Sequence, residues 1–91
     1  MENKLSRGIP IRLAEKLKQV RTSLGLSQKE ISIRLGEYKD VSITRSNVSD
    51  YELGRRAPRL RVTYAYARLA NISLDVLIDD ALDLPATLRG N

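Results

Sequence analysis

The chain has 91 residues, with 16 lysines and arginines against 11 acidic residues, and it contains no His, Cys, Trp or Phe. This composition predicts one small basic domain that forms no disulfide, no zinc site of the usual kind and no Cys/His or Ser/His/Asp catalytic group. We therefore expect no enzyme, no metal and no cofactor. The sequence also has no signal-peptide pattern and no apolar run long enough to span a membrane, so a cytoplasmic protein is expected.

The first predicted helix follows Pro10, which suits a first helical position, and it ends at Gly25 as a left-handed cap. Its apolar stripe consists of Leu13, Leu17, Val20 and Leu24. A second helix is predicted over residues 28–35, because Ser27 and Glu30 have the spacing of a capping box. A glycine at the next position stops it.

A third helix is predicted over residues 45–53 with Thr44 as its N-cap, and a fourth over residues 60–70 that Asn71 ends. A fifth, short helix follows the N-cap Ser73. Because no segment alternates like a strand, the chain is predicted to be all-α with five helices. The expected core consists of Leu13, Leu17, Val20, Leu26, Ile31, Leu35, Val48, Tyr51, Leu69, Leu74 and Leu77.

Basic charge is concentrated in the first two-thirds of the chain. Residues 1–61 hold 14 basic and 7 acidic residues, whereas residues 62–91 hold 2 and 4. This asymmetry is typical of a protein with an anionic partner on one side, although surplus surface lysine and arginine explain the counts equally well.

The outward side of the third helix carries short polar side chains. At 100° per residue, Ser46, Ser49 and Asp50 lie opposite Val48 and Tyr51. Short side chains let the helix backbone approach another body closely, whereas an ordinary surface helix carries long Glu and Lys there. A simply solvated surface is the alternative.

Arg45 stands in the first turn of this helix, where a cation opposes the helix dipole, and such a local conflict is a hint of function. Arginine matches the two acceptors of guanine in the major groove, serine donates or accepts, and Asp50 can accept from the cytosine amino group. We therefore expect base reading by Arg45, Ser46, Ser49 and Asp50.

A loop with four arginines in seven residues follows the third helix. Clustered guanidinium groups suit phosphate oxygens, and such contacts weaken steeply with salt. Arg55, Arg56 and Arg59 are the expected phosphate contacts, together with Asn47 near the start of the helix.

These features resemble the phage-repressor/Cro (Xre-like) helix-turn-helix family over about residues 11–79. The motifs that carry the resemblance are Arg21 before Gly25, Leu26-Ser27-Gln28, Ser32, Leu35-Gly36, Val48, Tyr51-Glu52-Leu53-Gly54, Pro58 and Ser73-Leu74-Asp75. The resemblance implies a lambda-repressor-like five-helix domain whose third helix enters the major groove. It also implies a structural ion pair between Arg21 and Glu52, and a phosphate contact by Gln28, which is otherwise simply a good helix former.

The sequence departs from the family's pattern between the second and third helices. Residues 37–43 are an insertion before Thr44, and the extra loop either projects toward the DNA backbone with Tyr38 and Lys39 or is a tolerated surface insertion. Residues 9–82 are expected to form the domain, with a flexible arm over 1–8 and a loose tail over 83–91.

The sequence therefore predicts a sequence-specific double-stranded DNA-binding transcriptional regulator, expected to be a repressor of prokaryotic or phage origin associated with the nucleoid. A palindromic operator and a homodimer are expected, because a second copy doubles the DNA interface. The expected dimer surface, which ordinary core packing explains equally well, consists of Tyr64, Tyr66, Leu74, Ile78 and Leu82. The alternative is an antitoxin-like or other interaction module that binds a partner protein through its C-terminal part.

Overall fold

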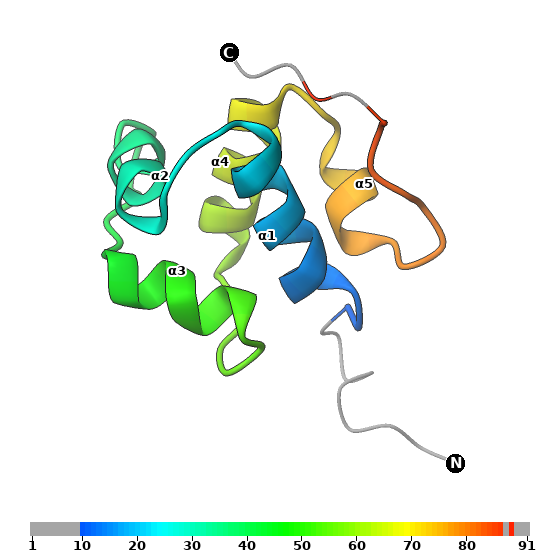
Figure 1. Cartoon of the computed structure of the whole chain (residues 1–91), viewed down its shortest axis with the longest axis horizontal. Coiled ribbons are helices and arrows are strands. Elements are labelled where there is room, and N and C mark those ends of the chain that lie inside the picture. Colours follow the sequence, from blue (N-terminus) through cyan, green and yellow to red (C-terminus); the bar gives the residue numbers. More distant parts are fainter. Residues whose placement is uncertain (1–9, 87, 89–91) are drawn as a thin grey trace.

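The computed structural model describes residues 10–86 and 88, which contain five α-helices and no strand (Figure 1). The helices are α1 (Leu13–Ser23), α2 (Gln28–Leu35), α3 (Arg45–Glu52), α4 (Leu60–Ala70) and α5 (Leu74–Ile78). The predicted all-α class with five helices is confirmed, while the expected arm over 1–8 lies outside the described residues. Among the described helices, not one has the length and apolar character needed to cross a membrane.

Local capping sets most helix ends where the sequence predicts them. At α2 the Ser27 side chain accepts from the Glu30 backbone N–H, and the Glu30 carboxylate accepts from the Ser27 N–H. Thr44 and Asn47 make the same reciprocal pair of bonds at the start of α3. Asn71 ends α4 in the left-handed conformation, with φ of 59°. These bonds satisfy backbone groups that have no partner inside a helix.

The start of α1 differs from the prediction. Pro10 lies outside the helix, which begins at Leu13. The backbone N–H groups of Ile11 and Arg12 donate to the two carboxylate oxygens of Asp80, each at 2.9 Å. The cap of α1 therefore comes from the other end of the chain, so no local sequence pattern announces it.

The core lies between α4 and the other helices. Leu17, Val20 and Leu35 are fully buried as predicted, whereas Leu26 and Leu74 are only partly buried and pack against the edge of the core. The sequence prediction omitted six apolar or aromatic residues that are buried, including three small alanines and one valine outside the predicted helices. These are Val41, Val62, Ala65, Tyr66, Ala67 and Ala70.

Tyr66 corrects one part of the expected dimer surface. Its side chain is fully buried inside the monomer, so it is a core residue and cannot contact a second copy. The expected dimer surface is thus in part ordinary core, the alternative explanation of these residues. Tyr64, Ile78 and Leu82 do remain exposed.

The insertion over 37–43 folds back onto the domain. Val41 is buried and Tyr38 packs against the core, and the Val41 N–H donates to the Tyr38 carbonyl at 3.2 Å. Asp40 allows the chain to turn by taking a left-handed conformation, with φ of 62°. Lys39 stays exposed. Because the insertion is anchored in this way, α2 and α3 still pack against each other.

The segment after α5 is attached to α1. The Arg12 guanidinium donates to the backbone carbonyl of Asp80 and to the carboxylate of Asp83, both at 2.8 Å. Leu84 packs against the core. Residues 83–86, expected to be the start of a loose tail, therefore lie against the first helix.

A fully buried lysine reinforces this attachment. The Lys16 ammonium donates to the backbone carbonyls of Val76, Asp79 and Leu82 at 2.8, 2.9 and 2.7 Å. All three donors of the ammonium are thereby satisfied, as a buried charge requires. Lys16 thus binds the end of α5 and the following turn to α1.

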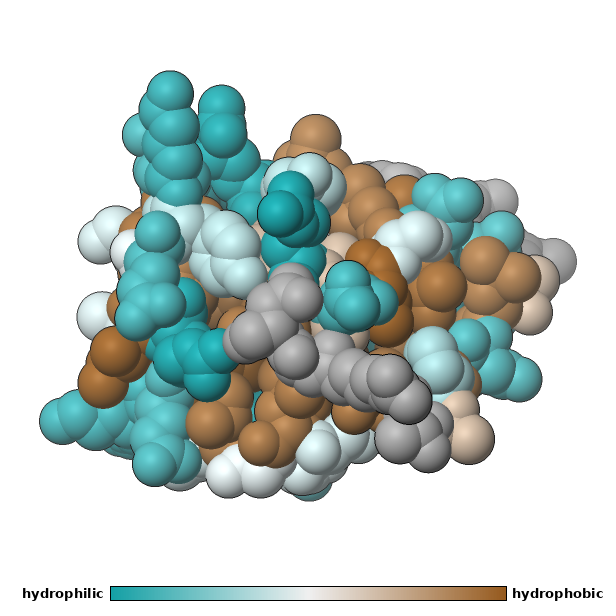
Figure 2. Space-filling view, turned by 90° about the horizontal axis from the view of Figure 1, so that it is seen from above, coloured by the Kyte–Doolittle hydropathy of each residue, from teal (hydrophilic) through white to brown (hydrophobic). Residues whose placement is uncertain are grey.

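The five helices place α3 at the outside of the molecule. In Figure 1, α1 and α4 occupy the centre, α2 and α3 form one end, and α5 lies at the opposite end. Seen from above, with α3 on the far side, hydrophilic side chains cover much of the end that holds α2, while apolar ones are mixed among them elsewhere (Figure 2). On α3 itself, Arg45 and Ser46 are exposed, so this helix is accessible to another molecule.

Candidate nucleic-acid interface

α3 has a buried side and an outer side. Val48 and Tyr51 are buried in the core. On the outer side, Arg45 and Ser46 are exposed, whereas Ser49 and Asp50 are half-buried. No described segment of the chain covers this side completely, and its side chains are short apart from Arg45 at one end and the exposed Leu53 at the other. The backbone of α3 can therefore approach a partner surface.

Arg45 is the first residue of α3, and the first turn contains no acidic residue. A guanidinium at the positive end of a helix dipole is locally unfavourable. Its position is consistent with an acceptor supplied from outside the protein, such as the N7 and O6 atoms of guanine.

The turn after α3 depends on Gly54. This residue has φ of +74°, a left-handed conformation in which any side chain would be strained. Gly54 directs the chain into the arginine loop, defined as residues 55–59, which leads to α4. Arg55, Arg56 and Arg59 are all exposed there.

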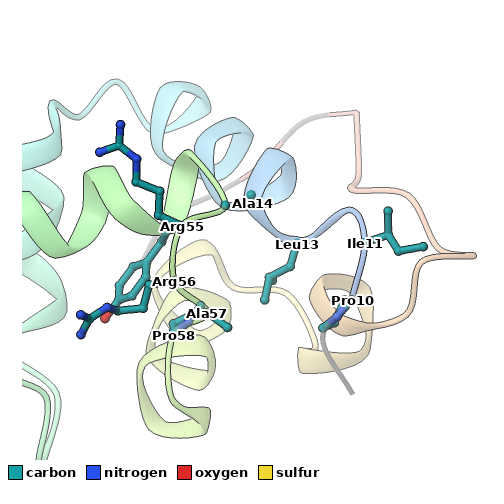
Figure 3. Close-up of a pocket in the computed structure, with 10 residues that line it drawn as sticks. Pro10, Ile11, Leu13, Ala14, Arg55, Arg56, Ala57 and Pro58 are labelled. Atoms are coloured by element: carbon teal, nitrogen blue, oxygen red, sulfur yellow. The ribbon is translucent and has the colours of Figure 1, made fainter. Parts of the chain in front are cut away.

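Arg55 and Asp50 connect the arginine loop to the outer side of α3. The Arg55 Nη1 atom lies 3.8 Å from Asp50 Oδ1, and 70% of the Arg55 side chain is exposed. A pair this long and this exposed contributes little stability. Figure 3 shows Arg55 and Arg56 extending away from the apolar residues behind the loop. Both guanidinium groups are therefore accessible to an anion.

Two of the expected phosphate contacts also have structural roles. The Gln28 amide nitrogen donates to Glu52 Oε1 at 3.2 Å, and the Asn47 amide oxygen accepts from the Thr44 N–H at 2.9 Å. Gln28 therefore helps to hold α2 against α3, and Asn47 caps α3. Each amide nitrogen carries two hydrogens, so these bonds leave donor capacity for a phosphate.

Arg21 and Glu52 form a bidentate ion pair between α1 and α3. Arg21 Nε lies 2.6 Å from Glu52 Oε2 and Nη2 lies 3.0 Å from Oε1, while only 14% and 4% of the two side chains are exposed. The hydrogen bond to Glu52 raises the pKa of Arg21. Arg21 also donates to the Leu26 carbonyl at 3.0 Å. This pair fixes the inner side of α3 and so orients the outer side.

Tyr66 lies close enough to this ion pair to feel its charges, and it is a core residue and not the dimer contact that the sequence predicted. Its hydroxyl is fully buried and has no hydrogen-bond partner among the described residues. Burial is the main cause that raises the pKa of Tyr66 above its ordinary range, with a further contribution from the charge of Glu52. Tyrosine is usually only partly buried, so the residue type alone does not decide between a core position and a surface position here.

The fold and this surface define a helix-turn-helix domain, in which a short helix pair presents its second helix outward. The helix-turn-helix family model matches residues 17–77, and the chain belongs to this family. The chain is also 32% identical over 83 residues to the SPbeta prophage-derived uncharacterized HTH-type transcriptional regulator YonR of Bacillus subtilis (strain 168), covering 81% of this chain and 71% of the relative. No solved structure matches the chain.

Proposed function

We propose that this protein is a sequence-specific double-stranded DNA-binding transcriptional regulator that acts as a repressor and has no enzymatic activity. The observation that carries the proposal is the exposed outer side of α3, with short polar side chains and the arginine loop directly after it. Membership of the helix-turn-helix family and likeness to a prophage regulator support it. The proposed place of action is the nucleoid of a prokaryotic or phage-infected cell.

In this proposal, different residues make the base contacts and the phosphate contacts. The exposed Arg45 donates to guanine, Ser46 and Ser49 bond base edges, and Asp50 accepts from a cytosine amino group. Arg55 exchanges its loose pairing with Asp50 for a phosphate, which leaves the Asp50 carboxylate for the base. The remaining proposed phosphate contacts are Gln28, Asn47, Arg56 and Arg59.

The operator in this proposal is palindromic and binds two copies of the chain. One α3 reaches few base pairs, and in helix-turn-helix dimers of this type the half-sites are about 34–36 Å apart, one turn of the duplex. The second copy doubles both the base contacts and the phosphate contacts. Residues 79–86 lie against α1, so a partner protein that needs this segment would have to displace the bonds of Arg12 and Lys16.

Selection of duplexes from a random pool by the full chain tests the proposal. The expected result is a shared palindromic sequence bound about 10³-fold or more tightly than a shuffled duplex of the same composition. Placing that sequence over a promoter should lower transcription when the chain is present. Equal affinity for selected and shuffled duplexes would refute sequence-specific binding. Increased transcription would refute only the repressor role and would leave sequence-specific binding standing.

A further inference from the structure

The outer side of α3 ends in an apolar side chain. Leu53 directly follows the last residue of the helix and is 61% exposed. Its backbone N–H donates to the Ser49 carbonyl at 3.0 Å, and its φ and ψ, −88° and −3°, are those of a right-handed helix. Leu53 therefore continues the helical path, seven positions after Ser46. At 100° per residue, its side chain leaves the helix on the same side as those of Ser46, Ser49 and Asp50.

The neighbours of Leu53 distinguish it from an ordinary exposed leucine. Single apolar side chains are common on protein surfaces and need no explanation by themselves. On the outer side of α3, however, Leu53 is the one apolar side chain in the part of the chain that the structure describes. The arginine loop begins two residues later with Arg55, whose side chain is 70% exposed. The other members of the outer side are polar, namely Arg45, Ser46, Ser49 and Asp50.

Duplex DNA offers a leucine one favourable contact in the major groove. The base edges there present hydrogen-bond donors and acceptors, and the apolar group among them is the C5-methyl group of thymine. A phosphate oxygen needs a donor, which leucine lacks, so packing Leu53 against the DNA backbone would desolvate a charged group without a bond in return. The thymine methyl group is therefore the chemical partner that suits Leu53.

We propose that Leu53 reads a thymine in each half-site by packing against its C5-methyl group. The inference rests on the proposed function, in which the outer side of α3 lies in the major groove. It adds a base to those that the polar side chains recognise, and it adds a form of recognition that needs no hydrogen bond.

The length of α3 predicts where this thymine lies. Leu53 stands eight positions after Arg45. At 1.5 Å per residue, the two residues are about 12 Å apart along the helix axis. Base pairs are about 3.4 Å apart, so a helix that lies along the groove places the thymine about three to four base pairs from the guanine that Arg45 contacts.

Replacing thymine with deoxyuridine tests the contact, because this change removes only the methyl group. The full chain is titrated with the palindromic duplex that it selects, with deoxyuridine at one thymine of one half-site at a time. At one thymine, about three to four base pairs from the guanine, the wild type is expected to bind about fourfold more weakly. This loss corresponds to about 0.8 kcal/mol for one buried methyl-sized group.

Leu53→Ala completes the test as a double-mutant cycle. The variant should bind the thymine and deoxyuridine duplexes equally at this position while keeping the preference for guanine. Because the Leu53 side chain is exposed, the change should not unfold the domain, and circular dichroism checks this. The matched control is Ile33→Ala on α2, at an isoleucine that is 58% exposed and lies outside α3. This control should respond to deoxyuridine as the wild type does.

Two results obtained with a selected duplex would overturn the proposal. One is that deoxyuridine weakens binding of the wild type at no thymine. The other is that Leu53→Ala keeps the wild-type difference between thymine and deoxyuridine. Both results would leave sequence selection by the polar side chains, and hence the proposed function, standing. A chain that selects no sequence at all would refute the proposed function and the reading of thymine by Leu53 with it.

Discussion

Glu52 is a carboxylate held almost entirely out of water, and one arginine is paired with it. Replacing Arg21 with leucine leaves the Glu52 carboxylate with the Gln28 amide as its remaining side-chain donor. We expect the free energy of unfolding to fall by about 3 kcal/mol, the usual cost of removing one partner of a buried pair. Urea denaturation measures this, and the double variant Arg21→Leu with Glu52→Leu should recover part of the loss. An unchanged midpoint for Arg21→Leu would show that the pair contributes nothing.

Tyr66 presents the opposite case, a buried polar atom whose removal should cost nothing. Its hydroxyl has no partner among the described residues, so burying it is unfavourable. We expect Tyr66→Phe to leave the free energy of unfolding unchanged or to raise it by up to about 1 kcal/mol. Tyr51→Phe, at a tyrosine that is 6% exposed, is the comparison. A loss above about 1 kcal/mol for Tyr66→Phe would mean that an internal water bonds the hydroxyl.

At the scale of the helices, sequence patterns predict a helix start correctly where both capping residues are close together in the sequence. Ser27 and Glu30 are three residues apart, and Thr44 and Asn47 likewise, so the spacing alone predicts the starts of α2 and α3. The start of α1 could not be predicted in this way, because its cap is Asp80, 68 residues beyond Arg12. Lys16 escaped prediction for the same reason, since a lysine is expected at the surface until its carbonyl partners are known.

The capping of α1 by Asp80 predicts how stability depends on pH. The N–H groups of Arg12 and Ile11 lower the pKa of the Asp80 carboxyl below its unfolded value of about 3.9. The capping contribution is therefore complete above about pH 4 and is lost as the pH falls through the folded pKa. We expect Asp80→Ala to have a lower melting temperature at pH 7 and a flatter decline in acid than the wild type. Parallel declines for the two proteins would contradict the capping role.

At the scale of the whole molecule, the sequence could predict the outer side of α3 but not every role of its neighbours. A helical wheel separates Ser46 and Asp50 from the buried Val48, because helix geometry fixes these directions. It cannot show that the Gln28 amide bonds Glu52, since that contact joins two helices. Nor can a helical wheel show that the insertion packs onto the core through the buried Val41, since Val41 lies outside the helices.

The arginine loop predicts a specific dependence of DNA affinity on salt. Each phosphate contact releases counterions, so removing one guanidinium should lower the slope of log affinity against log salt by about 1. We expect Arg56→Ala to show this change while keeping the preference for the selected sequence. Lys18→Ala, at an exposed lysine on α1, should leave the slope unchanged. An unaltered slope for Arg56→Ala would exclude a phosphate contact.

The most direct test of the account is the base preference of Arg45→Ala, measured on a set of duplexes in which each base pair of the selected half-site is replaced in turn. If the outer side of α3 reads bases, the wild type discriminates at every contacted position, and the variant loses about 1–3 kcal/mol of discrimination at one guanine only. If Arg45→Ala instead weakens binding to all duplexes equally, Arg45 contacts the backbone, and the assignment of α3 as the base-reading helix is contradicted.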